Sequence, residues 1–379
     1  MSTTVGIMSM QRIHNYGSSL QAYGLRRLLE GLSDDITVSF VDYEPGDILI
    51  EDPDANAASS KLGRTLSKVA EYNDVDARFS DKLRFFNHKR AYGRRYFPMI
   101  GITPEPNRDL DVDVQVIGSD EVFNCVQSNT NVGYSRDLFG HRSPARKVVS
   151  YAASFGNTTI DKIDAAGLRG QLAEDLTRLD AISVRDRNSA EIVEQLIGQR
   201  PAIHVDPVLA HDFANLETRV PSHRLFDGKY VIVYGYAGRL DHEENEILRR
   251  YASGLGATIL CFGGVQECCD RFIDCDPFEL LAYFRDAEAI ITDTFHGTIL
   301  SIINEKPFGA IIRKSVGHGY GNEEKLGFLL DTFGLESQKV ADLAGISEVL
   351  GNEIDFGIVE QVLTQEKNRT HEYLLHAVL

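Results

Sequence analysis

The sequence predicts an α/β protein made of two parallel-sheet domains in series. Short apolar runs alternate with helical stretches along most of its 379 residues, a pattern typical of parallel sheets covered by helices. The length suggests two domains, at roughly 100–200 residues per domain. A polar stretch over residues 211–228, with Pro221 and Gly228, interrupts the alternation and marks a boundary.

The first domain is expected over residues 1–215. Its strands are predicted at 4–9, 37–42, 112–118, 147–151, 181–184 and 202–205. Leucines on one face and the stop at Gly31 predict a helix over 18–31. Residues 47–107 break the rhythm, and the helical, charged and aromatic stretch at 67–95 indicates a helical insert in this domain.

The second domain is expected over residues 216–355, followed by an amphipathic helix over 356–379. Its strands are predicted at 230–234, 257–262, 288–292 and 308–312, and its helices at 241–253, after the cap Asp276, and at 297–303. Two such domains imply a cleft between them. Ligands then bind at the carboxyl ends of strands and at helix N-termini that face this cleft.

The charge balance limits the classes of partner. With 39 basic and 56 acidic residues the formal net charge is −17, which disfavours nucleic acid because a polyphosphate would be repelled. The first ten residues lack a basic region followed by an apolar run, and no apolar run reaches about 18 residues. We therefore expect a cytoplasmic protein, with a local basic pocket still allowed.

The cysteines do not predict a metal site. Their odd number, five, fits a reducing compartment better than a disulfide framework. The adjacent pair Cys268-Cys269 is poorly suited to tetrahedral zinc, and no C-x-x-C pair is present. We expect neither a metal nor a cofactor.

Two loops of the first domain carry polar side chains at strand ends. His14, Asn15 and Tyr16 precede the first helix, and Ser119, Asp120 and Asn124 follow the strand at 112–118. Backbone N–H groups at a helix start can bind an anion. The alternatives are an ordinary strand-to-helix turn for the first loop and helix capping by Ser119 or Asp120 for the second.

Arg185 is the first candidate anion ligand. It directly follows the strand at 181–184, and a cation in such a place must be paired or must hold an anion. An internal salt bridge with Asp186 or Asp206 is the alternative.

The second domain offers further candidates at two strand ends. Asp293, His296 and Gly297 lead from a strand into a short helix, where a histidine is suited to proton transfer or phosphate contact. Arg313 and Lys314 follow the next strand and suggest an anion pocket. A structural histidine and simple surface solvation are the alternatives. Since no nucleophile elbow or metal-binding motif is present, these groups together imply an anionic small-molecule donor.

Seven short segments in order resemble the polysaccharide pyruvyl transferases. They are N-Y-G-S-x-L-Q-A-Y at 15–23, D-Y-E-P at 42–45, G-S-D-x-V-x-N at 118–124, Y-A-A-S-F-G at 151–156, S-V-R-D at 183–186, D-P-V-L at 206–209 and D-T-F-H-G-T at 293–298. Each segment is weak alone, but seven in register are specific for this family.

The resemblance implies a GT-B-like fold, with two Rossmann-like domains that face a cleft. It also implies transfer of the enolpyruvyl-derived group of phosphoenolpyruvate onto a sugar, as a ketal, with release of phosphate. The resemblance assigns donor binding to His296 and Arg185, and less directly to Arg313. From the residues themselves we also expect Gly297 and Lys314 to bind the donor, His296, Asp120 and Asp293 to be catalytic, and the acceptor to be bound by His14, Asn15, Tyr16, Ser119 and Asn124.

The implied acceptor is a sugar of a bacterial surface polysaccharide or its lipid-linked precursor. The basic and aromatic insert suggests at most a peripheral membrane contact, at the inner face, and a packed helix with a solvated face is the alternative. The sequence leaves the oligomeric state undecided, and a homo-oligomer is one of the options.

Three departures from the family pattern stand out. Phe123 stands where the family often has Trp, and Glu121 where it often has Gln. The stretch at 322–326 lacks the usual arginine, for which Lys325 is a substitute. The alternative function is a GT-B glycosyltransferase or sugar-nucleotide epimerase, with Glu279 or Glu305 on the ribose. A sugar-binding protein without activity is a third reading.

Overall fold

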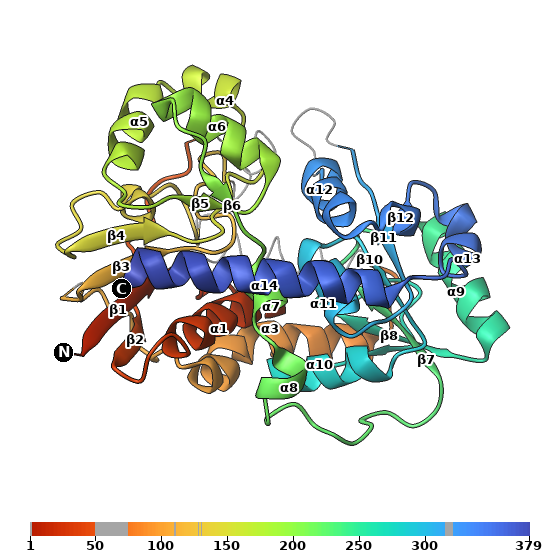
Figure 1. Cartoon of the computed structure of the whole chain (residues 1–379). Coiled ribbons are helices and arrows are strands. Elements are labelled where there is room, and N and C mark those ends of the chain that lie inside the picture. The colour runs from red at the N-terminus through yellow and green to blue at the C-terminus, as the bar shows by residue number, and fades with distance from the viewer. Residues whose placement is uncertain (1, 50–74, 110, 128, 130, 315–320) are drawn as a thin grey trace. The chain divides into compact units, whose positions relative to one another are not determined.

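The structure is a computed structural model that describes residues 2–49, 75–109, 111–127, 129, 131–314 and 321–379 (Figure 1). The chain divides into two units. Unit 1 comprises the described residues within Met1–Glu51, Gly93–His211 and Gln361–Leu379, and unit 2 those within Asp52–Tyr92 and Asp212–Glu360. Each unit contains an all-parallel sheet, as the alternating pattern predicts.

The sheet of unit 1 has the strand order β2-β1-β3-β4. Its strands are β1 (Thr3–Met8), β2 (Ile36–Phe40), β3 (Val114–Ile117) and β4 (Lys147–Ser150). Isolated parallel bridges, such as Val149 to Ala181, continue it to the short pair β5 (Ser183–Val184) and β6 (Ala202–Ile203). Because the chain moves from β1 to β2 on one side and then to β3 on the other, a crevice opens where β1 and β3 end.

Helices cover this sheet. They are α1 (Tyr16–Glu30), α4 (Ile160–Ala165), α5 (Arg169–Thr177), α6 (Arg187–Ile197) and α7 (Pro207–Ala210), with a 3-10 turn at Arg136–Phe139. Helix α1 begins where Asn15 accepts the backbone N–H of Ser18 at 2.7 Å. It packs closely on α7, because a Cβ on Gly24 would lie 2.9 Å from the carbonyl oxygen of Pro207.

The sheet of unit 2 has the order β12-β11-β10-β7-β8-β9. Its strands are β7 (Tyr230–Tyr234), β8 (Thr258–Phe262), β9 (Arg271–Phe272), β10 (Ala289–Thr292), β11 (Phe308–Ile311) and β12 (Lys339–Val340). If β7 is counted as the first strand and the sheet is read from β9, the order is 3-2-1-4-5-6, which is common in dinucleotide-binding folds. The direction of strand succession reverses between β7 and β10. Both units are therefore Rossmann-like.

The helices of unit 2 have clear start signals. They are α8 (Phe213–Leu216), α9 (His242–Leu255), α10 (Pro277–Asp286), α11 (Phe295–Ile303), α12 (Glu323–Phe333) and α13 (Ile346–Val349). Asp241 with Glu244, and Asp276 with Glu279, form capping boxes. The predicted cap at Asp276 is confirmed.

Two long helices run from one unit into the other: α3 (Phe79–Ile100) and α14 (Phe356–Val378). The predicted insert was assigned to the first domain, but the first half of α3, up to Tyr92, groups with unit 2. Of the predicted helical stretch 67–95, residues 67–74 lie outside the described residues. Within the described part of the chain, no helix combines the length and apolarity needed to cross a bilayer.

The C-terminal part of α14 closes the core of unit 1 over His204. The Tyr373 ring packs against the His204 ring in a tilted arrangement, with the centroids 4.6 Å apart, and its hydroxyl donates to the carbonyl of Ser150. The His204 Nδ1 lies 2.8 Å from the Ser183 hydroxyl, and the side chain is 5% exposed. Burial, and to a lesser extent Arg369, lowers the pKa of His204 from 6.5 to about 4.

This burial predicts a loss of stability in acid. His204 stays neutral in the native state, whereas in the unfolded chain it takes up a proton below about pH 6.5. Stability is therefore lost as the pH falls from about 6.5 toward about 4. Between about pH 7 and pH 5, wild type should lose about 2 kcal/mol more free energy of unfolding than His204→Asn, as measured by urea denaturation. Equal losses in the two proteins would refute this account.

Candidate functional site

In unit 2, charged side chains meet where the strand order reverses. Asp293 follows β10 and Arg239 follows β7, and these two strands are neighbours in the sheet. The Arg239 Nη1 donates to the Asp293 Oδ2 at 3.1 Å. The guanidinium also lies over the Tyr236 ring, 4.4 Å from its centroid, a cation–π contact that orients it. Asp293 is nearly buried and Arg239 is partly exposed, so the arginine is the partner accessible to solvent.

Helix α11 begins beside this pair. Thr294 is its N-cap and accepts the backbone N–H of Gly297 at 2.9 Å. The Thr294 backbone N–H in turn donates to the hydroxyl of Thr292. His296 lies in the first turn, half-buried, with its ring edge-on to Phe295. Because the N-terminal turn of a helix carries partial positive charge, this position favours an anion next to the histidine.

Asn322 ties two strand ends of unit 2 together. Its Nδ2 donates to the carbonyls of Asp293, at 2.7 Å, and Ile311, at 2.9 Å. Its Oδ1 accepts the backbone N–H of Arg313 at 2.7 Å. The amide is 1% exposed, and it holds the backbones of Asp293 and Arg313 in a fixed relation. The sequence marked this stretch for its missing arginine and overlooked the asparagine.

Arg313 and Lys314, which were predicted to form one anion pocket, have different surroundings in the structure. Arg313 forms a two-bond ion pair with Glu244, at 2.6 and 2.9 Å, and these hydrogen bonds raise the pKa of Arg313. Lys314 is exposed. The positive charge of Arg313 is therefore largely balanced, whereas Lys314 points its charge toward solvent.

Glycines allow the loops after β7 and β8 to approach each other. Gly263 has φ +79°, and a Cβ there would lie 2.9 Å from the carbonyl of Gly235. A Cβ on Gly235 would lie 3.1 Å from the Asp293 Oδ1. Gln266, in the loop after β8, links the two loops because its side-chain amide donates to the Tyr236 carbonyl at 2.6 Å. Sequence reasoning missed Arg239 and Gln266, which lie five residues beyond β7 and four beyond β8.

In unit 1, Asp120 stands at the equivalent crevice between β1 and β3. It adopts φ 78° and accepts the Ser18 hydroxyl at 2.9 Å, in the first turn of α1. Its other oxygen lies 3.8 Å from the Arg185 guanidinium. The side chain is only partly buried. A carboxylate so placed is oriented by its hydrogen bond and lies within reach of solvent.

Arg185 makes the internal salt bridge that the sequence left open. Its Nη1 lies 2.9 Å from the Asp206 carboxylate, and the two residues are 5% and 0% exposed. Burial alone would lower the pKa of Arg185, but the charges of Asp206 and Asp120 outweigh it and raise the pKa. This arginine is part of the buried frame of unit 1.

The predicted acceptor-binding residues have mostly structural contacts. Tyr16 is buried, and Asn15 caps α1. Ser119 is buried and donates to the carbonyl of Ala152. Asn124 donates to Glu121 and accepts from Thr158. His14 packs edge-on against Phe97, at 5.5 Å, and is the most accessible of the five with Asn15.

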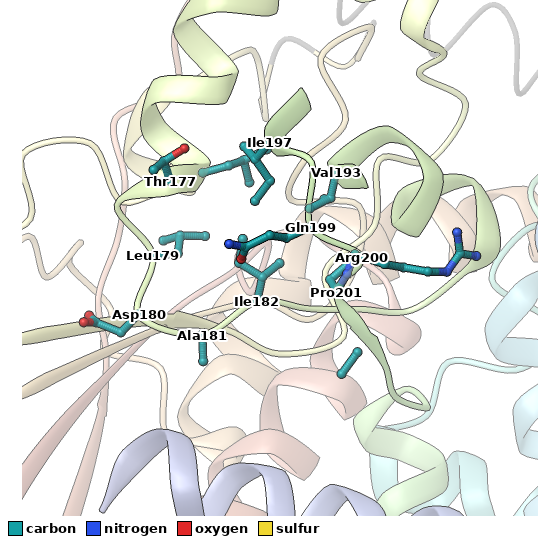
Figure 2. Close-up of a pocket in the computed structure, with 12 residues that line it drawn as sticks. Thr177, Leu179, Asp180, Ala181, Ile182, Val193, Ile197, Gln199, Arg200 and Pro201 are labelled. Atoms are coloured by element: carbon teal, nitrogen blue, oxygen red, sulfur yellow. The ribbon is translucent and has the colours of Figure 1, made fainter. Parts of the chain in front are cut away.

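Two pockets of unit 1 lie at opposite edges of its strands. One of about 220 Å³ opens at the carboxyl ends of β1 and β2 and is lined by Arg12, Asp42, Tyr43 and Arg108 among others. Another of about 280 Å³ opens at the amino ends of β5 and β6 (Figure 2), lined by apolar side chains such as Leu179 and Ile182 together with the polar residues Thr177, Asp180, Gln199 and Arg200. Neither pocket is lined by a predicted site residue.

The structure thus gathers the predicted residues into two groups. Unit 2 brings Asp293, His296 and Gly297 together, with the backbone of Arg313 linked to that of Asp293 through Asn322. Unit 1 brings Asp120 together with Arg185 and Ser119 around Asp206. The described residues contain no set of three or more His, Cys, Asp or Glu side chains arranged to hold a metal ion.

Comparison with known proteins supports one family. The sequence profile of the polysaccharide pyruvyl transferases matches residues 15–315. No curated protein matches the sequence.

The fold is similar to that of two solved structures. A candidate UDP-N-acetylglucosamine 2-epimerase from Listeria monocytogenes has a TM-score of 0.51 at 10% identity, with 97% of this chain and 95% of that chain covered. A second UDP-N-acetylglucosamine 2-epimerase has a TM-score of 0.51 at 10% identity, with 99% and 95% covered. At this identity the likeness concerns the fold, which is GT-B-like.

Arg185→Met should destabilise the protein strongly. It leaves Asp206 buried without its guanidinium, and breaking a buried pair from one side costs about 3–5 kcal/mol. The double variant Arg185→Met/Asp206→Asn should recover part of the lost free energy of unfolding, as measured by urea denaturation. If Arg185 served an incoming anion instead, the single variant would keep its stability.

Gly297→Ala should disturb the start of α11. A Cβ there would lie 2.1 Å from the Thr292 hydroxyl oxygen and 2.7 Å from that of Thr294. We expect a loss of about 1–3 kcal/mol in free energy of unfolding. The double variant Gly297→Ala/Thr292→Ala lacks the closer clash and should therefore regain part of the lost free energy of unfolding. A single variant as stable as wild type would contradict the steric argument.

Proposed function

Since this chain belongs to the polysaccharide pyruvyl transferase family, we propose that it moves the enolpyruvyl-derived group of phosphoenolpyruvate onto a sugar of a bacterial surface polysaccharide or its lipid-linked precursor. The product is a pyruvate ketal, and phosphate is released. The observation that carries this proposal is the group at the reversal point of unit 2, where His296, Asp293 and Arg239 stand at the start of α11.

The donor is a small molecule with a carboxylate and a phosphate. The start of α11, with Gly297, offers a helix N-terminus for one of these anions. Arg239 supplies a partly exposed cation beside it, and Lys314 an exposed one directly after Arg313. Arg313 is paired with Glu244 and its backbone N–H donates to Asn322, so we expect it to position this loop rather than to bind the donor. A local anion site of this kind is compatible with the net charge of −17, because it acts at short range.

Ketal formation needs an acid first and then a base for each hydroxyl. His296 is the acid that protonates the methylene carbon of the donor, or the group that assists the departing phosphate. One sugar hydroxyl attacks the adjacent carbon, phosphate leaves, and a second hydroxyl closes the ring.

Asp120 is our candidate base. Its carboxylate is partly exposed and oriented by Ser18. Asp293, in contrast, is nearly buried and ion-paired with Arg239, so its role is to orient that arginine. In unit 1, His14 and Asn15 remain the accessible candidates for the acceptor sugar.

A nucleotide-sugar enzyme is the second candidate, because the fold is shared with UDP-sugar epimerases. Of the acidic residues expected to hold a ribose, Glu279 is engaged in the capping box of α10. Glu305 is exposed just after α11. Calorimetric titration separates the candidates: binding of phosphoenolpyruvate supports the proposal, and binding of UDP-sugars alone overturns it.

The central experiment is phosphate release from phosphoenolpyruvate with a panel of lipid-linked saccharide acceptors. His296→Ala should lower kcat by about 10²-fold or more, since proton transfer by a positioned group contributes at least that much. The matched control is His371→Ala, an exposed histidine on α14, which should keep wild-type turnover. Both variants should have the melting temperature of wild type. Near-normal turnover in His296→Ala would contradict the catalytic role of His296.

A further inference from the structure

Helix α3 presents two opposite faces over its first half. Asp81, Phe85, His88 and Tyr92, spaced three or four residues apart, are all buried. The Asp81 Oδ1 accepts the backbone N–H of Phe272 in the edge strand β9 at 3.0 Å, and His88 lies 2.7 Å from Asp274. This face is docked firmly within unit 2.

The outer face carries large apolar side chains in the same spacing. Phe79, Leu83 and Phe86 are 80%, 49% and 36% exposed, and Arg90 continues their row. In the described chain few large apolar residues are this exposed, and three of them share this helix face. Such a row is unfavourable in water, so it calls for a partner surface.

The same segment is strongly basic. Between Arg78 and Tyr92 stand five basic residues and a single acidic residue, Asp81, which is buried. The basic residues are Arg78, Lys82, Arg84, Lys89 and Arg90. Arg78 and Arg84 donate to backbone carbonyls of unit 2, so the charge beside the apolar row comes from Lys82, Lys89 and Arg90. In a chain of net charge −17, this helix is a local positive patch that flanks an apolar row.

We propose that the outer face of α3 binds an anionic membrane surface. Phe79, Leu83 and Phe86 enter the boundary between headgroups and acyl chains, and Lys82, Lys89 and Arg90 lie against lipid phosphates. Because the described helices are too short or too polar to span a bilayer, this contact is peripheral. It goes beyond the proposed reaction, which a soluble acceptor also permits.

A lipid surface fits this face better than a protein partner. Three side chains make a patch far smaller than the roughly 800 Å² per partner of a stable protein interface. A symmetric dimer through α3 would place two sets of basic residues opposite each other. An anionic bilayer needs no matching shape and complements both the charge and the apolar row.

The test is flotation of the full chain with phosphatidylcholine vesicles, with or without about one third phosphatidylglycerol. Wild type should partition onto the anionic vesicles at least about tenfold more strongly, and added salt should weaken this binding. Phe79→Ser/Phe86→Ser should lower the partition coefficient at least about tenfold. Lys82→Glu/Arg90→Glu should abolish the preference for phosphatidylglycerol.

The matched control is Arg250→Glu/Leu255→Ser, which changes an exposed cation and an exposed leucine on α9. It should float like wild type. All variants should keep wild-type melting and wild-type phosphate release with a soluble acceptor, which separates this proposal from the proposed function. Equal flotation of wild type and the α3 variants would overturn it. So would a lipid-free dimer that the α3 variants abolish, since the face would then belong to a second copy.

Discussion

The reversal of strand order in each parallel sheet is the constraint on which the site depends. In unit 2 the chain winds outward from β7 to β9 and then returns to β10 on the other side. The loops after β7 and β10 consequently diverge, and the space at their carboxyl ends is filled by side chains rather than by a crossing connection. Arg239 and Asp293 meet there. The same reversal in unit 1, between β1 and β3, leaves room for Asp120 beside Ser18.

Buried polar groups then determine how rigid these strand ends are. A buried amide or charge is costly unless it is paired, and both units meet this demand at the candidate site. Asn322 satisfies carbonyls from two strands of unit 2. In unit 1, Arg185 and Asp206 neutralise each other in the core. His296, Arg239 and Asp120 lie on this fixed frame, which is what positioning for chemistry requires.

Sequence reasoning succeeded where a signal was local. The strands of unit 2 with four or more residues were predicted to within about two residues, and the cap at Asp276 was identified from the Asp-Pro pair alone. The edge strands β9 and β12 were missed, because two residues cannot show alternation. Arg239 was missed because it lies five residues beyond β7 and its partner Asp293 is 54 residues away.

By itself the sequence determined the fold class, the order of the strands along the chain, the family and the cluster around His296, because periodicity, caps and short motifs are local properties. Only the tertiary structure decided which residues the charged side chains pair with. Arg185 could have held an anion or a carboxylate, and only the adjacent end of β6, 21 residues on, supplied Asp206. Likewise, the basic composition of α3 was visible in the chain, but only packing against β9 decided which of its faces is buried and which remains exposed.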